Sequence, residues 1–243
     1  MSQDAVLVHG GFHGGWCWRP VAEPLRRLGW TVHAPSLTGC GDRAHLLSPK
    51  VTLDDQIQDI VGLIEAEELS DVILCAHSAG GMVTTGVAER IPDRIAHLVY
   101  LDATVPTPGE SMLDVLGNAE GMADAMRMLA ADSGDGWRIP SALFTAEAFG
   151  VTDPADRDWV TRRLTADSLR VAEEPLHCGP GLARVPRKTY VRAERFAVSF
   201  HDRVHDRLAD DPAWRTLSWD IGHNMMIIDP ERVVGLLVEA AAA

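Results

Sequence analysis

The chain has 243 residues, of which 46% are hydrophobic, and its formal net charge is −13. This length suits one globular domain with an insertion, and the hydrophobic content excludes an intrinsically disordered chain. The negative charge argues against nucleic-acid binding and against docking on anionic membranes, because both need a basic face. No apolar stretch reaches the roughly 20 residues that cross a bilayer. We therefore expect neither a nucleic-acid nor a membrane partner.

The first hundred residues alternate short apolar runs with segments of helical periodicity. Buried strands are predicted at 5–9, 31–34, 72–76 and 95–101, and helices at 18–28, from residue 52, and at 79–90. The second helix begins with Thr52 and Asp55 in a capping-box relation. Buried strands joined by helices are typical of a parallel sheet with right-handed crossovers. The pattern predicts an α/β fold with a mostly parallel, doubly wound sheet.

This alternation stops after the strand that ends near Asp102. Residues 106–185 show several helical stretches and no clear strand, so we interpret them as a helical cap inserted into the fold. The core pattern then resumes with strands at 187–192 and 215–219 and helices near 198–208 and from residue 230. The predicted organisation is a core of residues 1–105 and 186–243 and a cap of residues 106–185.

Cysteine usage and the start of the chain bear on its location. The four cysteines form no C-x-x-C pair, and no charged segment followed by an apolar segment and a cleavage site opens the sequence. We therefore expect four reduced thiols and a cytoplasmic protein. No His, Cys, Asp or Glu cluster has metal-ligand spacing, and the Gly-rich segment 9–15 lacks the Lys-Ser/Thr of a phosphate-binding loop. Neither a metal nor a cofactor is expected.

A serine flanked by small residues lies between a predicted strand and a predicted helix. Residues 76–81 read A-H-S-A-G-G, which places Ser78 at the turn. A nucleophilic serine in such a turn is strained and exposed, and its neighbours must be small because the backbones approach closely. The simpler interpretation is a serine that caps the helix. We favour the nucleophile because two other segments accompany it.

These two segments are loops at the ends of predicted strands. H-G-G-F follows the first strand, and the Gly11 N–H paired with the Ala79 N–H would bind an oxyanion. G-H-N follows the last core strand, where His223 can accept the Ser78 proton. The ordinary interpretation of H-G-G-F is a plain turn between a strand and a helix, and that of G-H-N is a surface histidine. Together, the three segments indicate a serine hydrolase.

The motifs resemble those of α/β-hydrolases of the plant methylesterase and hydroxynitrile lyase group and its bacterial esterase relatives. The resemblance spans nearly the whole chain, and its matching stretches are residues 6–18, 76–81, 100–103, 148–160 and 222–223. It implies the α/β-hydrolase fold. The lyases carry Thr just after the first strand and Lys just after the catalytic His, where this chain has Gly10 and Asn224. Both differences favour ester hydrolysis, because Asn cannot supply the charge that holds cyanide.

In the family that this chain resembles, the acid that orients the catalytic His is an Asp in the turn after the strand 187–192. This chain has no Asp there. The turn reads A-E-R-F, so Glu194 is one candidate to orient His223, although it is long and flanked by arginines. The other is Asp102, at the tip of the preceding strand, where haloalkane dehalogenase-like relatives carry their acid. The simpler interpretation of Glu194 is a surface ion pair, and that of Asp102 is a structural role. We favour Asp102 and keep Glu194 as the alternative.

Candidate pocket residues are Phe12, His13 and Met225, whereas cap methionines on one helical face are interpreted as core: Met112, Met122, Met126 and Met128. The expected activity is that of a serine carboxylic-ester hydrolase that acts on a small, largely apolar ester through an acyl-enzyme. A homodimer is a reasonable assembly. The alternative is a non-hydrolytic, C–C bond-cleaving or cyclising tailoring enzyme on the same scaffold, suggested by the irregular acid turn. A non-catalytic ligand receptor is disfavoured by the retained motifs.

Overall fold

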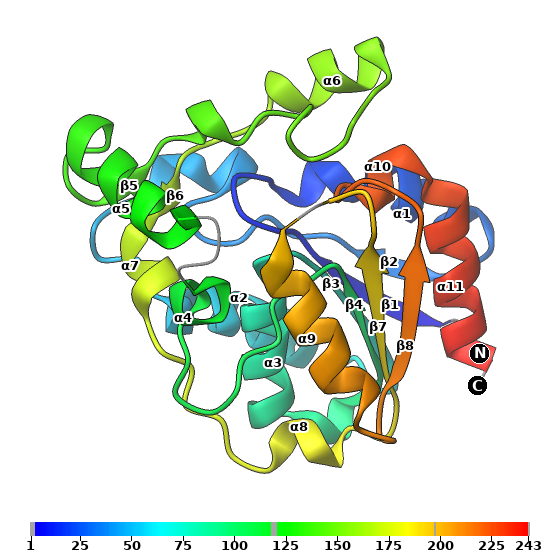
Figure 1. Cartoon of the computed structure of the whole chain (residues 1–243). Helices are drawn as coiled ribbons and strands as arrows, with labels where there is room; N and C mark the ends of the chain where they lie inside the picture. The colour runs from blue at the N-terminus through cyan, green and yellow to red at the C-terminus, as the bar shows by residue number, and fades with distance from the viewer. Residues whose placement is uncertain (1–2, 118–120, 197, 243) are drawn as a thin grey trace.

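A six-stranded parallel sheet organises the chain, whose computed structural model describes residues 3–117, 121–196 and 198–242 (Figure 1). The sheet order is β2-β1-β3-β4-β7-β8, and every neighbouring pair is parallel. The strands are β1 (Asp4–Val8), β2 (Thr31–His33), β3 (Val72–His77), β4 (Ile95–Leu101), β7 (Lys188–Ala193) and β8 (Arg215–Trp219). The prediction of a mostly parallel, doubly wound sheet is confirmed.

Helices cover both faces of this sheet (Figure 1). On one face α3 contacts β3 and β1, and α9 contacts β7; on the other, α1 contacts β2, and α11 contacts β3 and β4. The core helices are α1 (Arg19–Arg27), α2 (Leu53–Ala66), α3 (Gly80–Arg90), α9 (Ser199–Ala209), α10 (Met225–Ile228) and α11 (Pro230–Ala242). Short 3₁₀ turns are η1 (Gly15–Trp18), η2 (Gly41–Leu46) and η3 (Pro92–Arg94).

Strand geometry explains the continuous apolar runs of the sequence. Successive side chains of a strand point to opposite faces, so a strand covered on both sides is apolar at every position. In β1, Val6 and Val8 belong to the hydrophobic cluster that includes the side chains of α2 and α3, whereas Ala5 and Leu7 belong to the cluster that includes α1 and α11. The expected capping box of α2 is also present, because Thr52 and its partner three residues later exchange both hydrogen bonds.

In its described residues, the segment between β4 and β7 contributes no strand to the six-stranded sheet. It holds α4 (Met112–Leu116), α5 (Met122–Ser133), η5 (Ser141–Leu143), α6 (Pro154–Thr161), α7 (Leu169–Glu173) and α8 (Gly181–Arg184). It also contains two antiparallel strands that we did not expect, β5 (Arg138–Ile139) and β6 (Asp167–Ser168). Each is only two residues long, too short for a period of two to show in the sequence. In Figure 1, α5, α6, β5 and β6 lie beyond the carboxyl ends of β7 and β8.

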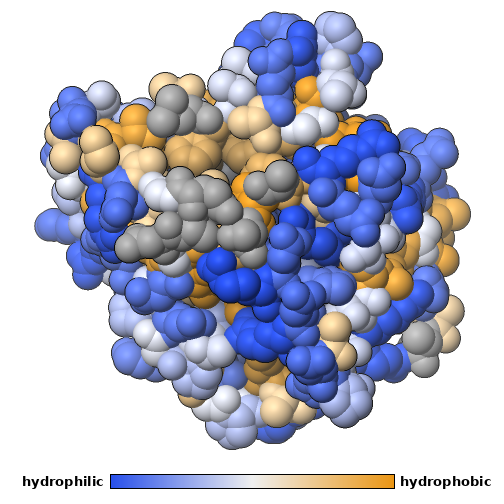
Figure 2. Space-filling model, viewed as in Figure 1, coloured by the Kyte–Doolittle hydropathy of each residue, from blue (hydrophilic) through white to orange (hydrophobic). Residues whose placement is uncertain are grey.

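The surface of the molecule is mainly hydrophilic on the face drawn in Figure 2. Hydrophobic residues gather in its upper part, over the segment between β4 and β7. Within the described ranges, no helix combines the length and the apolar character needed to span a membrane. The four cysteines are free thiols, three of them buried.

Candidate active site

Ser78 lies at the turn between β3 and α3 in the left-handed region of backbone space, with φ of 52°. A serine rarely adopts this conformation, which costs energy and is found at strained functional turns. The backbone on both sides packs too closely for larger residues. A Cβ at Gly80 would lie 2.5 Å from the His9 carbonyl oxygen, and one at Gly81 would overlap the carbonyl of Thr104. The turn therefore has the features of a nucleophile elbow.

The loop after β1 contacts this turn directly. A Cβ at Gly10 would lie 2.6 Å from the Cβ of Ser78. The threonine that hydroxynitrile lyases carry at this position would therefore not fit unless the backbone moved. A Cβ at Gly11 would lie 3.8 Å from the Cβ of Ala79, which makes these two residues neighbours on the wall of one cavity. Among the described residues, no hydrogen bond uses the N–H of Gly11 or Ala79. Both donors are therefore available to a ligand.

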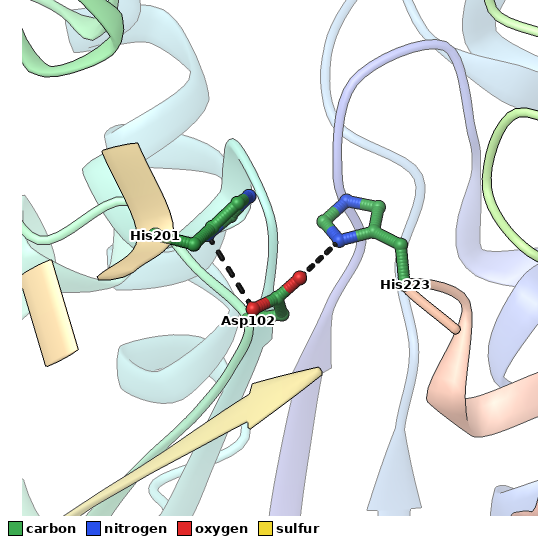
Figure 3. Close-up of side chains that lie close together, drawn as sticks. All are labelled: Asp102, His201 and His223. Atoms are coloured by element: carbon green, nitrogen blue, oxygen red, sulfur yellow. Dashed lines mark hydrogen bonds and ion pairs between the residues drawn. The ribbon is translucent and has the colours of Figure 1, made fainter. Parts of the chain in front are cut away.

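His223 lies in the loop between β8 and α10 and lines the same cavity as Ser78. Its Nδ1 is 2.7 Å from Oδ2 of Asp102, a fully buried carboxyl group at the end of β4 (Figure 3). Because a carboxylate accepts, Nδ1 carries the proton and Nε2 is left as an acceptor. Glu194, the alternative acid, is exposed. The structure thus brings Asp102 to His223.

The carboxylate of Asp102 is surrounded by donors. Its Oδ1 accepts from Nη1 of Arg192 and from the backbone N–H of Ala193, each at 3.0 Å. Burial alone would raise the pKa of Asp102, but the imidazoles of His201 and His223 and the guanidinium of Arg192 hold it below the usual value. Asp102 is therefore ionised at neutral pH.

His201, on α9, is a second histidine beside the same carboxylate. Its Nδ1 is 3.5 Å from Oδ1 of Asp102, so the carboxylate lies between two imidazoles (Figure 3). Burial lowers the pKa of His201 to about 3, so at neutral pH it is uncharged and the guanidinium of Arg192 is the fixed positive charge of the group. Its Nε2 has no partner among the described residues, and its side chain lines the cavity.

Ligand atoms of Asp102, His201 and His223 lie within 4.8 Å of one another, a separation that a metal ion could bridge. The surroundings do not fit a cation. The guanidinium of Arg192, itself buried, already neutralises Asp102, and the side chain of His223 directs a proton, not a lone pair, at the carboxylate. We therefore interpret the group as a hydrogen-bond network.

Two further histidines hold the loops of the site: His77, which the sequence did not single out, and His13, which we expected to line the pocket. Nε2 of His77 donates to the backbone carbonyl of His223 at 3.0 Å, which ties the nucleophile strand to the histidine loop. His13 receives the Asn224 amide at Nε2 (3.1 Å), so its Nδ1 donates to the Gly11 carbonyl at 2.7 Å. Burial lowers the pKa of His13 to about 3, which keeps this ring neutral. His13 thus acts on the loop backbone and is not among the described residues that line the cavity.

The cavity encloses about 100 Å³, and most of its wall is apolar. Phe12 lines it, as expected, and stacks on Phe144 with ring centroids 4.1 Å apart. Met225 does not line it, because its side chain is fully buried in the cluster on the α1 and α11 face of the sheet. The interpretation of the cap methionines as core holds only in part, because Met126 belongs to a core cluster and Met112 and Met122 pack against it. Met112, Met122 and Met126 all line the cavity, and Met128 is 64% exposed.

Known proteins share the sequence and the fold of this chain. A family model described as the alpha/beta hydrolase family matches residues 5–236. The chain belongs to this family. It is 42% identical to the carbendazim hydrolyzing esterase of Nocardioides sp. (strain SG-4G) over 236 residues, which cover 94% of this chain and 95% of that one. It has the α/β-hydrolase fold, and such relatives support ester hydrolysis by a carboxylesterase-type hydrolase.

Plant and bacterial relatives agree with this classification. Methyl jasmonate esterase 1 of Vitis vinifera is 36% identical over 107 residues, or 42% of this chain and 40% of the relative. Among solved structures, an extracellular α/β-hydrolase from a Paenibacillus species superposes with a TM-score of 0.82 at 25% identity, covering 98% of each chain. A pyrethroid hydrolase from Sphingobium faniae JZ-2 has a TM-score of 0.75 at 23% identity over 100% of this chain and 98% of that one, which shows the fold alone.

Proposed function

We propose that this α/β-hydrolase cleaves small, largely apolar carboxylic esters with Ser78 as nucleophile, His223 as general base and Asp102 as the acid that orients it. The observation that carries the proposal is the 2.7 Å contact between Nδ1 of His223 and Asp102 at the wall of the cavity that Ser78 lines. It leaves Nε2 of His223 free to take the Ser78 proton. No Ser78–His223 hydrogen bond is among the described contacts, and such bonds often tighten only when substrate binds.

The reaction proceeds in two halves. Ser78 Oγ attacks the ester carbonyl while its proton passes to His223, and the resulting oxyanion accepts hydrogen bonds from the N–H groups of Gly11 and Ala79. His223 then protonates the departing alcohol. In the second half, His223 activates a water that hydrolyses the acyl-enzyme and releases the acid. Asp102 stabilises the imidazolium that forms in both halves.

Residues 106–185 would act as a cap that shapes the acyl and alcohol sites, in keeping with the division into a core of 1–105 and 186–243. Support comes from α4, α5 and the loop near η5, which supply Met112, Met122, Met126 and Phe144 to the cavity wall. Methionine side chains adapt to apolar ligands of different shape. The names of the relatives include carbendazim, methyl jasmonate and pyrethroids, and we infer a small, largely apolar ester for this chain. A cytoplasmic location and a homodimeric assembly stay predictions.

The alternative of a non-hydrolytic tailoring enzyme rested on the missing acid in the turn after β7. That reason weakens because a carboxyl group of the neighbouring strand, that of Asp102, lies 2.7 Å from Nδ1 of His223. The ester hydrolase is therefore the function that the site supports best.

Labelling with a fluorophosphonate probe, read by intact mass, tests the proposal together with turnover of p-nitrophenyl acetate and butyrate. We expect one label on the wild type and none on Ser78→Ala, with turnover lost in the variant. Ser70→Ala removes an exposed serine and serves as the matched control. Normal ester turnover by Ser78→Ala would refute the assignment.

A further inference from the structure

The apolar cavity contains one acidic side chain that the proposed mechanism does not use. Asp167 belongs to β6 and lines the cavity together with Ser78 and His223. Two backbone groups hold its carboxyl group. Oδ1 accepts from the N–H of Ser168 at 2.9 Å, and Oδ2 accepts from the N–H of Phe12 at 3.2 Å. Both oxygens accept hydrogen bonds, as the oxygens of a carboxylate do.

This carboxylate has unused capacity for hydrogen bonds. Each oxygen can accept about two hydrogen bonds, and each has one described donor. Within the described ranges, no Lys, Arg or His forms an ion pair with Asp167. Burial raises the pKa of Asp167, because a charge in apolar surroundings is costly. A donor on a bound ligand would relieve that cost.

Its position relates Asp167 to the carbonyl group of the substrate. Oδ2 lies 3.0 Å from the Cβ position of Gly11, and that position is 3.8 Å from the Cβ of Ala79. Gly11 and Ala79 are the proposed oxyanion donors. A carbonyl oxygen held between their N–H groups therefore brings the substituents of its carbon next to the Asp167 carboxylate.

We propose that Asp167 selects esters that carry an N–H group next to the scissile carbonyl, as carbamates do. The inference rests on the proposed function. The N–H of the substrate donates to a free lone pair of the Asp167 carboxylate. This hydrogen bond offsets the repulsion between the carboxylate and the oxyanion that forms nearby. An ester with no donor leaves the spare lone pairs of the carboxylate without a partner, and the negative charges of the carboxylate and the oxyanion then oppose the transition state.

The chemistry for such a substrate balances with water as the only co-reactant. Ser78 Oγ bonds to the carbamate carbon, and the alkoxide leaves as an alcohol with the proton held by His223. Water then adds to the carbamoyl-enzyme and restores the Ser78 hydroxyl. The carbamic acid that is released loses carbon dioxide and leaves the amine.

Three matched methyl esters isolate the effect of the N–H: methyl N-phenylcarbamate, methyl N-methyl-N-phenylcarbamate and methyl phenylacetate. The last replaces the N–H by a methylene group. Each is assayed with the wild type, Asp167→Asn and Asp167→Leu. Asp132→Asn, which changes an exposed aspartate of α5, is the matched control.

We expect Asp167→Asn to lower kcat/KM for the N–H carbamate by roughly ten- to a hundredfold, the usual effect of a hydrogen bond to a charged group. Turnover of the N-methyl carbamate and of methyl phenylacetate should rise in both Asp167→Asn and Asp167→Leu, because both variants remove the charge that opposes the oxyanion. An equal loss for all three esters would show a structural role and overturn the inference. So would a wild type that cleaves methyl phenylacetate but not the N–H carbamate. Failure of the proposed function looks different, because Ser78 would not be labelled and no ester would be cleaved.

Discussion

Replacement of Asp102 by Asn is the sharpest test of the site, because the change keeps the size of the side chain. In the wild type, Oδ1 accepts from Arg192 and Ala193, and Oδ2 accepts from Nδ1 of His223. Asn can keep its oxygen on the first two donors only by turning its NH₂ group toward His223. Nδ1 then has to accept, the imidazole proton moves to Nε2, and the ring can no longer take the proton of Ser78.

The expected loss is large. In a serine protease triad the same change lowers turnover about 10⁴-fold, or about 5.4 kcal/mol of transition-state stabilisation. The variant also leaves the buried guanidinium of Arg192 without one of its two carboxylate partners. Asp202 remains 2.8 Å away but is largely exposed, so we expect a stability loss near the lower end of the about 3–5 kcal/mol typical of broken buried pairs.

The assay is kcat for p-nitrophenyl butyrate, normalised to folded protein by urea unfolding followed by circular dichroism. Glu194→Gln is the matched control, since Glu194 is exposed and should keep wild-type turnover. Retention of more than about a tenth of the activity in Asp102→Asn would refute the reasoning, because a misplaced proton cannot cost so little. A collapse in Glu194→Gln would instead assign the acid to the turn after β7.

Three further predictions concern charge, packing and pH. Arg192→Leu removes the fixed positive charge beside Asp102, so the pKa of Asp102 rises and the acid limb of the kcat/KM profile should move to higher pH; an unmoved limb would contradict this. Gly81→Ala forces a Cβ into a backbone carbonyl and should lower the free energy of unfolding by about 2 kcal/mol or more, whereas Gly62→Ala, which meets only the end of a flexible side chain, should be neutral or stabilising in urea unfolding. Burial lowers the pKa of His9 from 6.5 to about 4, so the unfolded chain binds more protons and stability should fall as pH drops from 6.5 to 4, by up to about 3 kcal/mol for this residue. A urea midpoint that is flat over this range would count against a neutral, buried His9.

Most of the fold could be predicted from the sequence because local patterns determine it. Strands buried on both faces read as apolar runs, and the predicted 95–101 strand agrees with the bounds of β4. The strands β5 and β6 could not be predicted, because a two-residue strand has no period. The small residues around Ser78 also indicated its turn, since close backbone packing restricts residue size locally.

The acid and the cavity wall depend on contacts between distant parts of the chain. From the sequence, both Glu194 and Asp102 were candidates for the acid that orients His223. Only the sheet order, with β4 beside β7, brings Asp102 to that ring. Helical periodicity marks Met126 as inward-facing, but it does not distinguish a core from a cavity. Asp167 gave no signal, because the Phe12 backbone that holds it lies 155 positions away.

The position of Asp102 at the end of β4 has a consequence for how this scaffold can be recombined. Ser78 and Asp102 end adjacent strands and are joined by one continuous β3–α3–β4 unit. A gene fragment that carries this unit would transplant nucleophile and acid together, already in register, and would need only a histidine loop from its new host. In the family that this chain resembles, the aspartate lies in the turn after β7. Here that turn does not have to supply the acid, so its residues can be varied in library design.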